Sequence, residues 1–157
     1  MNGEEFGMRV QAKRKELYLA ALSVVRNAED ADDAVSEAVT AAWENLHKLK
    51  DDGKFDMWML KILYNTAKDI YRKNRAYADI KELSEAFTYD PDIENIEFFD
   101  IICRCGFDGK TLKILILRFV YGYSLQEIAE GTGMSVSTVK TKYYRALKKL
   151  SMTEGLR

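Results

Sequence analysis

Apolar residues recur at spacings of three and four along most of this chain, and that period predicts α-helices. The pattern covers residues 4–25, 33–49 and 55–71 in the first half of the chain, and 93–103 and 111–120 in the second. No stretch alternates convincingly between apolar and polar residues, as a half-buried strand would. The sequence therefore predicts an all-α fold.

The same spacing predicts which side chains the helices bury. Trp58 lies at helical spacing from Phe55 and Ile62, which favours the core over a binding surface. Asn27 is expected to cap the turn that follows it, with Asp30 near the third position of that turn. In the first three predicted helices, the expected buried side chains are Leu17, Ala20, Ala21 and Val24, then Val35, Ala38, Val39, Ala42, Trp43, Leu46 and Leu49, then Phe55, Trp58, Met59, Ile62 and Leu63.

Residues 124–150 have the pattern of a helix-turn-helix. Ser124 and Glu127 can form a capping box, in which each side chain accepts a hydrogen bond from a free amide at the helix start. Gly133 falls where the chain must turn sharply, a conformation reached most easily without a Cβ. Ser135 is expected to cap the second helix, whose inward face is expected to carry Val136, Val139 and Leu147.

The outward face of that second helix carries hydroxyl and cationic groups. From a helix in the major groove, such groups can reach base edges and phosphates, so DNA is the first partner to consider. A plain helical hairpin with a solvated basic face is the alternative, and the spacing of Ala129, Gly133 and Val139 argues against it. The candidate DNA contacts are Ser137, Thr138, Lys140, Thr141, Tyr144, Arg145 and Lys148.

Residues 76–92 lose the helical period, gain acidic residues and include the one proline, Pro91. We therefore expect a flexible acidic linker at 78–91, in which Ile80, Leu83 and Phe87 could form a short helix. The linker would join two small helical domains, 1–77 and 92–157. The second is expected to be a four-helix domain that contains the helix-turn-helix.

Charge is distributed unevenly along the 157 residues, although the net charge is only −1. Residues 61–81 hold six basic and two acidic residues, and 140–149 hold five basic residues and no acidic one. Between them, residues 82–100 hold seven acidic residues and no basic one. Two cationic patches separated by an anionic tract favour two DNA contacts joined by a segment that DNA would repel.

Composition disfavours several functional classes. Residues 1–7 are polar and acidic, and no run of about 18 apolar residues is present, so we expect a cytoplasmic protein with no membrane insertion. Cys103, Cys105 and His47 cannot supply the roughly four ligands of a metal, and the two cysteines are expected to be buried or half-buried. Since there is no phosphate-cradling glycine loop either, we expect no metal, no cofactor, no catalytic residues and no enzyme activity.

One set of residues in each half matches the motifs of a known family. The first set is Asp33, Glu37, Ala42, Trp43, Phe55, Trp58, Ile62, Asn65, Ala67, Arg72, Lys73 and Arg75, and the second is Leu125, Glu127, Ile128, Ala129, Ser135, Thr138, Val139, Lys140, Arg145 and Ala146. These motifs resemble those of the extracytoplasmic-function (group IV) sigma factors, the smallest sigma subunits of bacterial RNA polymerase. The resemblance spans about residues 6–149 in the right order, and two matching regions are far more specific than one.

The resemblance implies a transcription initiation factor that binds core RNA polymerase, selects a promoter and helps to open it. An anti-sigma factor is an implied further partner. Asp33, Ser36 and Glu37 would dock on a coiled coil of the polymerase, with Ser36 standing where the family often has Gln. The second helix of the helix-turn-helix would read the minus-thirty-five element, and it has Lys142 where the family commonly has Arg.

The resemblance implies that the helix at 55–71 reads the minus-ten element. Aromatic, amide and cationic side chains along one helix suit a single strand, because bases stack on rings and cations follow phosphates. The resemblance makes Asn65 the residue that holds a base flipped out of the duplex. The candidate minus-ten contacts are Asn65, Lys68, Arg72 and Lys73.

One alternative is a conventional helix-turn-helix repressor or activator whose N-terminal half senses a ligand or dimerises. Asn65 within an aromatic and basic helix argues against it, and no heptad seam is evident. Tight binding of duplex DNA without polymerase would favour this alternative.

Overall fold

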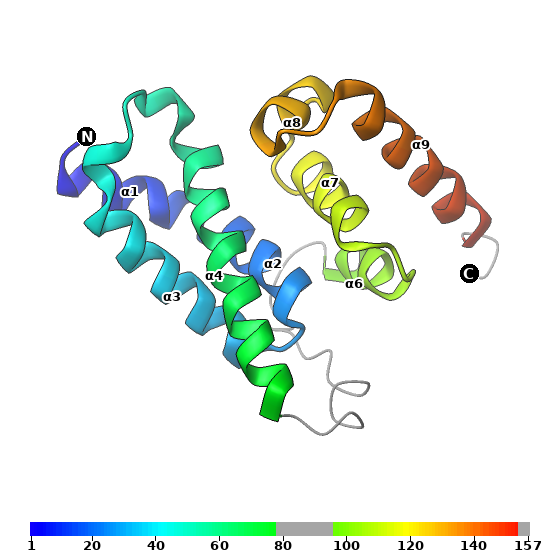
Figure 1. The fold of residues 1–157 in the computed structure, drawn as a ribbon, viewed down its shortest axis with the longest axis horizontal. Helices are drawn as coiled ribbons and strands as arrows, with labels where there is room; N and C mark the ends of the chain where they lie inside the picture. Colours follow the sequence, from blue (N-terminus) through cyan, green and yellow to red (C-terminus); the bar gives the residue numbers. More distant parts are fainter. Residues whose placement is uncertain (78–95, 154–157) are drawn as a thin grey trace. The chain divides into compact units, whose positions relative to one another are not determined.

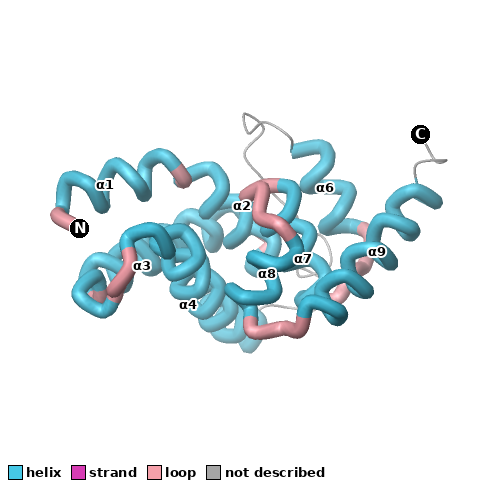
Figure 2. Tube along the Cα trace, turned by 90° about the horizontal axis from the view of Figure 1, so that it is seen from above, coloured by secondary structure: helices cyan, strands magenta, loops and turns pink. Residues whose placement is uncertain are grey.

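The computed structural model describes residues 1–77 and 96–153, and in this part of the chain every regular element is a helix (Figures 1 and 2). The predicted all-α fold is therefore confirmed. The chain divides into two compact units, Met1–Ile93 and Glu94–Arg157. The predicted linker at 78–91, with its possible short helix, lies outside the described residues.

The first unit is a bundle in which α2, α3 and α4 each pack against the other two. Helix α2 is buried on nearly every side, from Leu17 through Ser23 and at Val25, so it forms the centre of the core. Two short 3-10 turns connect α3 to α4. The elements are α1 (Gly3–Ala12), α2 (Arg14–Val25), α3 (Ala28–Glu44), η1 (Leu46–Lys48), η2 (Asp52–Lys54) and α4 (Phe55–Tyr77).

The single helix predicted at 4–25 is wrong, because the chain breaks at Lys13 into α1 and α2. Helix α1 buries only Phe6, whose ring lies 5.4 Å from that of Trp43 and 5.8 Å from that of Phe55. The break lets α1 place Phe6 on these rings while α2 fills the core. A helical period on both sides of one residue cannot reveal such a break, since both segments are helical.

The predicted limits and buried face of the second helix also need correction. Helix α3 begins at Ala28, capped by Asn27 as expected, and ends at Glu44 instead of continuing to Leu49. Its fully buried residues are Ala31, Ala34, Ala38 and Ala42, whereas Val35 and Val39 are half-buried and Trp43 is 51% exposed. Small side chains let α3 approach α2 and α4 closely, which displaces the larger apolar residues to the edge of the contact.

Helix α4 begins at Phe55 as predicted, and it buries Phe55, Met59 and Leu63. Trp58 and Ile62 are only half-buried, so the prediction that Trp58 is a core residue is partly wrong. Tyr64 is buried with 3% of its surface exposed, which places it in the core.

The second unit is built around α7, which buries Thr111, Leu112 and the run from Ile114 to Leu117. Cys103 is buried and Cys105 half-buried, as expected. The inward face of α9 differs from the prediction, because Tyr143 and Ala146 are buried with Val139 while Val136 and Leu147 are half-buried. The elements are α6 (Ile96–Arg104), α7 (Gly109–Phe119), α8 (Leu125–Thr132) and α9 (Val136–Thr153).

Candidate nucleic-acid and protein interfaces

Helices α8 and α9 form the helix-turn-helix that the sequence predicts. The capping box is present: the amide of Glu127 donates to Ser124 Oγ at 3.1 Å, and the amide of Ser124 donates to Glu127 Oε1 at 3.4 Å. Gly133 ends α8 with φ 76° and ψ 5°, a left-handed conformation that favours glycine. Ser135 Oγ then accepts the amide of Thr138 at 3.2 Å, so both helix starts are capped by local side chains.

The start of α9 presents a cluster of hydroxyl groups. Ser135 Oγ donates to Thr138 Oγ1 at 2.8 Å and lies 3.3 Å from Ser137 Oγ. Hydroxyls and free amides at a helix N-terminus suit an anion such as a phosphate. All seven candidate contacts on this helix are exposed on its surface, namely Ser137, Thr138, Lys140, Thr141, Tyr144, Arg145 and Lys148.

Two other cations of α9 turn back onto their own unit. Lys142 Nζ lies 3.4 Å from Asp108 Oδ2, at the start of α7, and only 27% of its side chain is exposed. Lys149 Nζ stands 5.1 Å from the centre of the Phe107 ring. In this structure the charge of Lys142 therefore faces Asp108.

Asp108 caps α7, and the hydrogen bonds that its carboxylate accepts hold its pKa below the ordinary value. Its pKa is lowered, first by the side-chain hydrogen bond of Thr111, then by that residue's amide at 2.7 Å, with partial burial opposing and Lys142 adding to the effect. Because folding lowers this pKa, the interactions stabilise the unit above the ordinary carboxyl pKa. That stability is lost as the pH falls through the lowered value.

Helix α4 carries a polar stripe on the side opposite its core residues. Lys61, Asn65, Lys68, Arg72 and Arg75 follow each other at spacings of four and three, and all are exposed. Lys61 and Arg75 were absent from the candidate contacts, although the spacing alone could have identified them. Lys73, which was a candidate, is exposed but lies off this stripe.

A hydrogen-bonded cluster joins the basic end of α4 to the start of α3. Asp30 Oδ2 accepts a hydrogen bond from Asn74 Nδ2 at 2.7 Å and another from Asn27 Nδ2 at 2.8 Å. Asp30 is half-buried. Its carboxylate therefore has a structural role, and it differs in this from the exposed acids that follow on α3.

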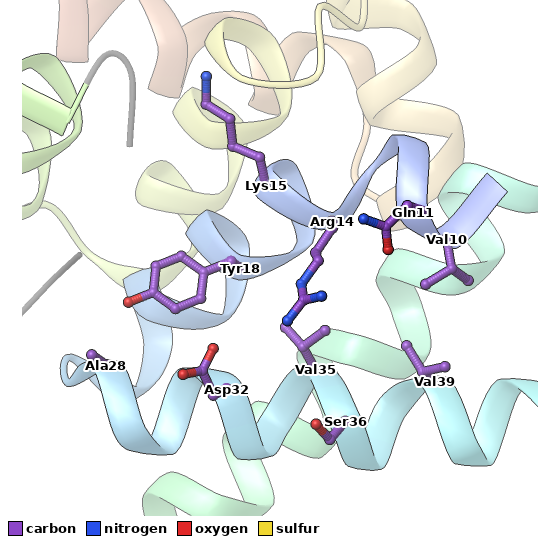
Figure 3. Close-up of a pocket in the computed structure, with 10 residues that line it drawn as sticks. All are labelled: Val10, Gln11, Arg14, Lys15, Tyr18, Ala28, Asp32, Val35, Ser36 and Val39. Carbon is purple, nitrogen blue, oxygen red and sulfur yellow. The ribbon is translucent and has the colours of Figure 1, made fainter. Parts of the chain in front are cut away.

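The candidate docking residues Asp33, Ser36 and Glu37 are all exposed on α3. Ser36 also lines a groove of about 950 Å³ between α1–α2 and α3, which the sequence did not indicate. Figure 3 shows side chains of Arg14 and Tyr18 on one wall of the groove, and of Asp32, Val35 and Ser36 on the other. The groove depends on the break at Lys13, because α1 supplies Val10 and Gln11 to its lining.

The arrangement suits binding more than chemistry. Each unit presents exposed cations on a helix, and the first unit also presents acids beside a groove. In the described residues, no helix is long and apolar enough to cross a membrane.

Two family models match the chain. The model described as Sigma-70 region 2 matches residues 10–77, and that described as Sigma-70, region 4 matches residues 110–150. The first covers α2, α3 and α4, and the second covers the helix-turn-helix.

Curated relatives match over most of their length. The chain is 32% identical over 138 residues to RNA polymerase sigma factor SigV of Bacillus subtilis, which covers 86% of this chain and 82% of that protein. It is 30% identical to ECF RNA polymerase sigma factor EcfG of Rhodopseudomonas palustris, over 83% of this chain and 75% of the relative.

Solved structures match over nearly the whole chain. The structure of CnrH in complex with the cytosolic domain of CnrY has a TM-score of 0.72 at 26% identity and covers 99% of this chain and 90% of that one. The sigma factor RpoE of Bartonella quintana, solved with the anti-sigma factor NepR, has a TM-score of 0.72 at 18% identity, over 95% of this chain and 96% of that one, and shows a similar fold.

Proposed function

The chain belongs to the extracytoplasmic-function sigma factors of the sigma-70 family, and from that premise we propose a role for each of its surfaces. It is a transcription initiation factor and not an enzyme: it binds core RNA polymerase and directs it to promoters, while the polymerase performs the phosphoryl chemistry. The proposed division is region 2 at 1–77, a linker at 78–91 and region 4 at 92–157.

One observation supports these roles above all others. Each family region presents exposed cations on a helix, and in each the opposite side of that helix is packed into the unit's core. Such surfaces suit phosphate backbones, and base-reading groups are interspersed among the cations. Neither surface carries enough cations to hold DNA tightly alone, which fits a protein that works on a larger enzyme.

Helix α4 is proposed to read and help melt the minus-ten element. Asn65 stands in the exposed stripe between two cations, Lys61 and Lys68, so a base held by its amide would have phosphates within reach of both neighbours. Flipping a base costs a few kcal/mol, and a preformed contact offsets that only for a base that fits. Lys68, Arg72 and Lys73 are the proposed phosphate contacts.

Helix α9 is proposed to read the minus-thirty-five element. The hydroxyl groups at its N-terminus could reach base edges and phosphates from a helix lying in the major groove, as in other helix-turn-helix proteins. Lys140, Arg145 and Lys148 supply the exposed cations, and Tyr144 supplies an exposed ring. Arg145 is the residue best suited to a bidentate contact with guanine.

Asp33, Ser36 and Glu37 are proposed to dock on a coiled coil of core polymerase, and the groove beside Ser36 extends that surface. We also propose an anti-sigma factor as a partner, since the structure of RpoE holds the anti-sigma factor NepR and that of CnrH holds the cytosolic domain of CnrY. A protein that works on core polymerase would act in the cytoplasm.

The test is transcription from a promoter library with purified core polymerase. We expect the wild-type chain to give promoter-dependent starts. Asn65→Ala should reduce promoter opening about tenfold or more while core binding stays unchanged, because its amide would act only on an unpaired base.

A variant with Asp33→Asn and Glu37→Gln should show the converse, a loss of core binding from which the loss of transcription follows. Glu44→Gln removes an exposed acid from the same helix and is the matched control. Equal loss of core binding and opening in the Asn65 variant would contradict the assigned roles.

A further inference from the structure

Arg26 occupies a backbone conformation that glycine usually takes. It ends α2 with φ 66° and ψ 15°, and it is the one residue other than glycine with positive φ in the described chain. At the three other such corners the chain uses glycine, namely Gly106, Gly122 and Gly133. A Cβ makes this conformation unfavourable, so the arginine occupies this position against a conformational preference.

No contact among the described residues explains the choice of arginine. Its amide donates to Leu22 O at 2.9 Å, a bond that any residue could make, whereas its exposed side chain forms no hydrogen bond or ion pair with another described residue. A long cation that stabilises nothing in its own unit is free to bind an external anion.

The fold places this corner beside the basic end of α4. Asn27 follows Arg26, and both Asn27 and Asn74 donate to the same oxygen of Asp30, at 2.8 Å and 2.7 Å. Asn74 lies in sequence between the cations Arg72 and Lys73 on one side and Arg75 on the other. Figure 1 shows the end of α2, the start of α3 and the end of α4 at the same end of the bundle.

Exposed acids lie close to Arg26 and would repel an approaching anion. Asp30 is occupied by two amide donors, but Glu29 and Asp32 are exposed acids close to the same corner. DNA that follows the basic stripe of α4 to its end would meet these acids. A cation at the corner offsets their repulsion.

We propose that Arg26 binds a backbone phosphate of promoter DNA and so extends the cationic surface of α4 onto the α2–α3 corner. The proposal rests on the proposed function of α4. Asn27, Asp30 and Asn74 act as positioning residues, since their hydrogen bonds hold the corner against α4.

Three substitutions separate charge from backbone strain. Arg26→Ala removes the cation and keeps the strain, Arg26→Gly removes both, and Arg26→Lys keeps both. Lys50→Ala is the matched control, because it removes an exposed cation beyond the other end of α3, roughly 25 Å away along that helix. Each full-length variant is assembled with core polymerase, and its promoter affinity is measured at several salt concentrations.

Loss of one phosphate contact should reduce the slope of log affinity against log salt by about 0.9 in the Ala and Gly variants, with no change in the Lys variant or in Lys50→Ala. Arg26→Gly should also melt a few degrees higher than Arg26→Ala. In Arg26→Gly, a higher melting temperature would accompany weaker promoter binding, and a purely structural role for Arg26 would not give that combination.

An unchanged slope in both the Ala and Gly variants would overturn the proposal, as would an equal loss in Lys50→Ala. Weaker binding to core polymerase with an unchanged slope would overturn it in favour of a polymerase contact. If the wild-type holoenzyme itself selects no promoter, the proposed function fails as well, and that control distinguishes the two failures.

Discussion

At the scale of single residues, position on a helix decides what a lysine does. Lys140 and Lys142 are two residues apart on α9 and have the same chemistry. Lys140 is exposed on the outward face, whereas Lys142 reaches Asp108 at the start of α7. Residues two apart lie on different sides of a helix. The number of basic residues at 140–149 therefore overstates the positive charge that is available to DNA.

We predict different consequences for removing the two charges. Lys140→Met should reduce the salt dependence of promoter binding by about 0.9 in slope and leave thermal stability unchanged, because one phosphate contact is lost. Lys142→Met should leave the slope unchanged and reduce stability by less than about 1 kcal/mol, since its ion pair is partly exposed. Methionine preserves most of the aliphatic stem in both variants. Salt titrations measure the slope and thermal melts measure the stability. A change of slope in the Lys142 variant would show that Lys142 does contact DNA.

At the scale of elements, the helix-turn-helix was predictable and the α1–α2 break was not. The corner between α8 and α9 is encoded by Ser124, Glu127, Gly133 and Ser135, each of which acts on backbone within about three residues. The break at Lys13 carries no such local signal. Lys13 precedes α2, but its side chain makes no capping hydrogen bond to that helix, and its amide donates to the carbonyl oxygens of Arg9 and Val10 in α1. Distant rings, those of Trp43 and Phe55, give α1 its position.

Two glycines of the second unit offer a matched test of the corner. A Cβ at Gly133 or at Gly109 would meet nothing within 4 Å, but only Gly133 has positive φ. Gly133→Ala should therefore destabilise the unit by about 1 kcal/mol through backbone strain alone. Gly109→Ala, at the first position of α7, should be neutral or stabilise it by up to about 1 kcal/mol. Chemical denaturation measures both, and equal effects would mean that the conformation of the corner is not the cause.

At the scale of the whole molecule, binding depends on using two weak surfaces together. Each unit has its own buried core, so each can present its helix independently of the other. A few cations per surface give weak binding at physiological salt, whereas two surfaces held on one template gain effective concentration without any new contact. Core polymerase supplies that arrangement in the proposed function.

We therefore predict that the isolated chain binds promoter duplex no more tightly than about micromolar at physiological salt. Addition of core polymerase should raise the apparent affinity a hundredfold or more. Fluorescence anisotropy with a labelled promoter measures the affinity with and without core polymerase. Arg145→Ala should weaken the affinity measured with core polymerase while leaving core binding intact. Tight binding by the isolated chain would instead indicate a conventional helix-turn-helix regulator.

The sequence alone determined the all-α class, the turn at Gly133 and the outward face of α9, because helical period and capping depend on residues a few positions apart. It also carried the motifs that place the chain in its family. Tertiary structure decided the rest. It buried Ala31 and Ala34 and left Trp43 exposed, turned Lys142 toward Asp108 and brought Asn74 to Asp30. Those outcomes depend on close packing between segments far apart in the chain, and the local order of residues carries no record of such contacts.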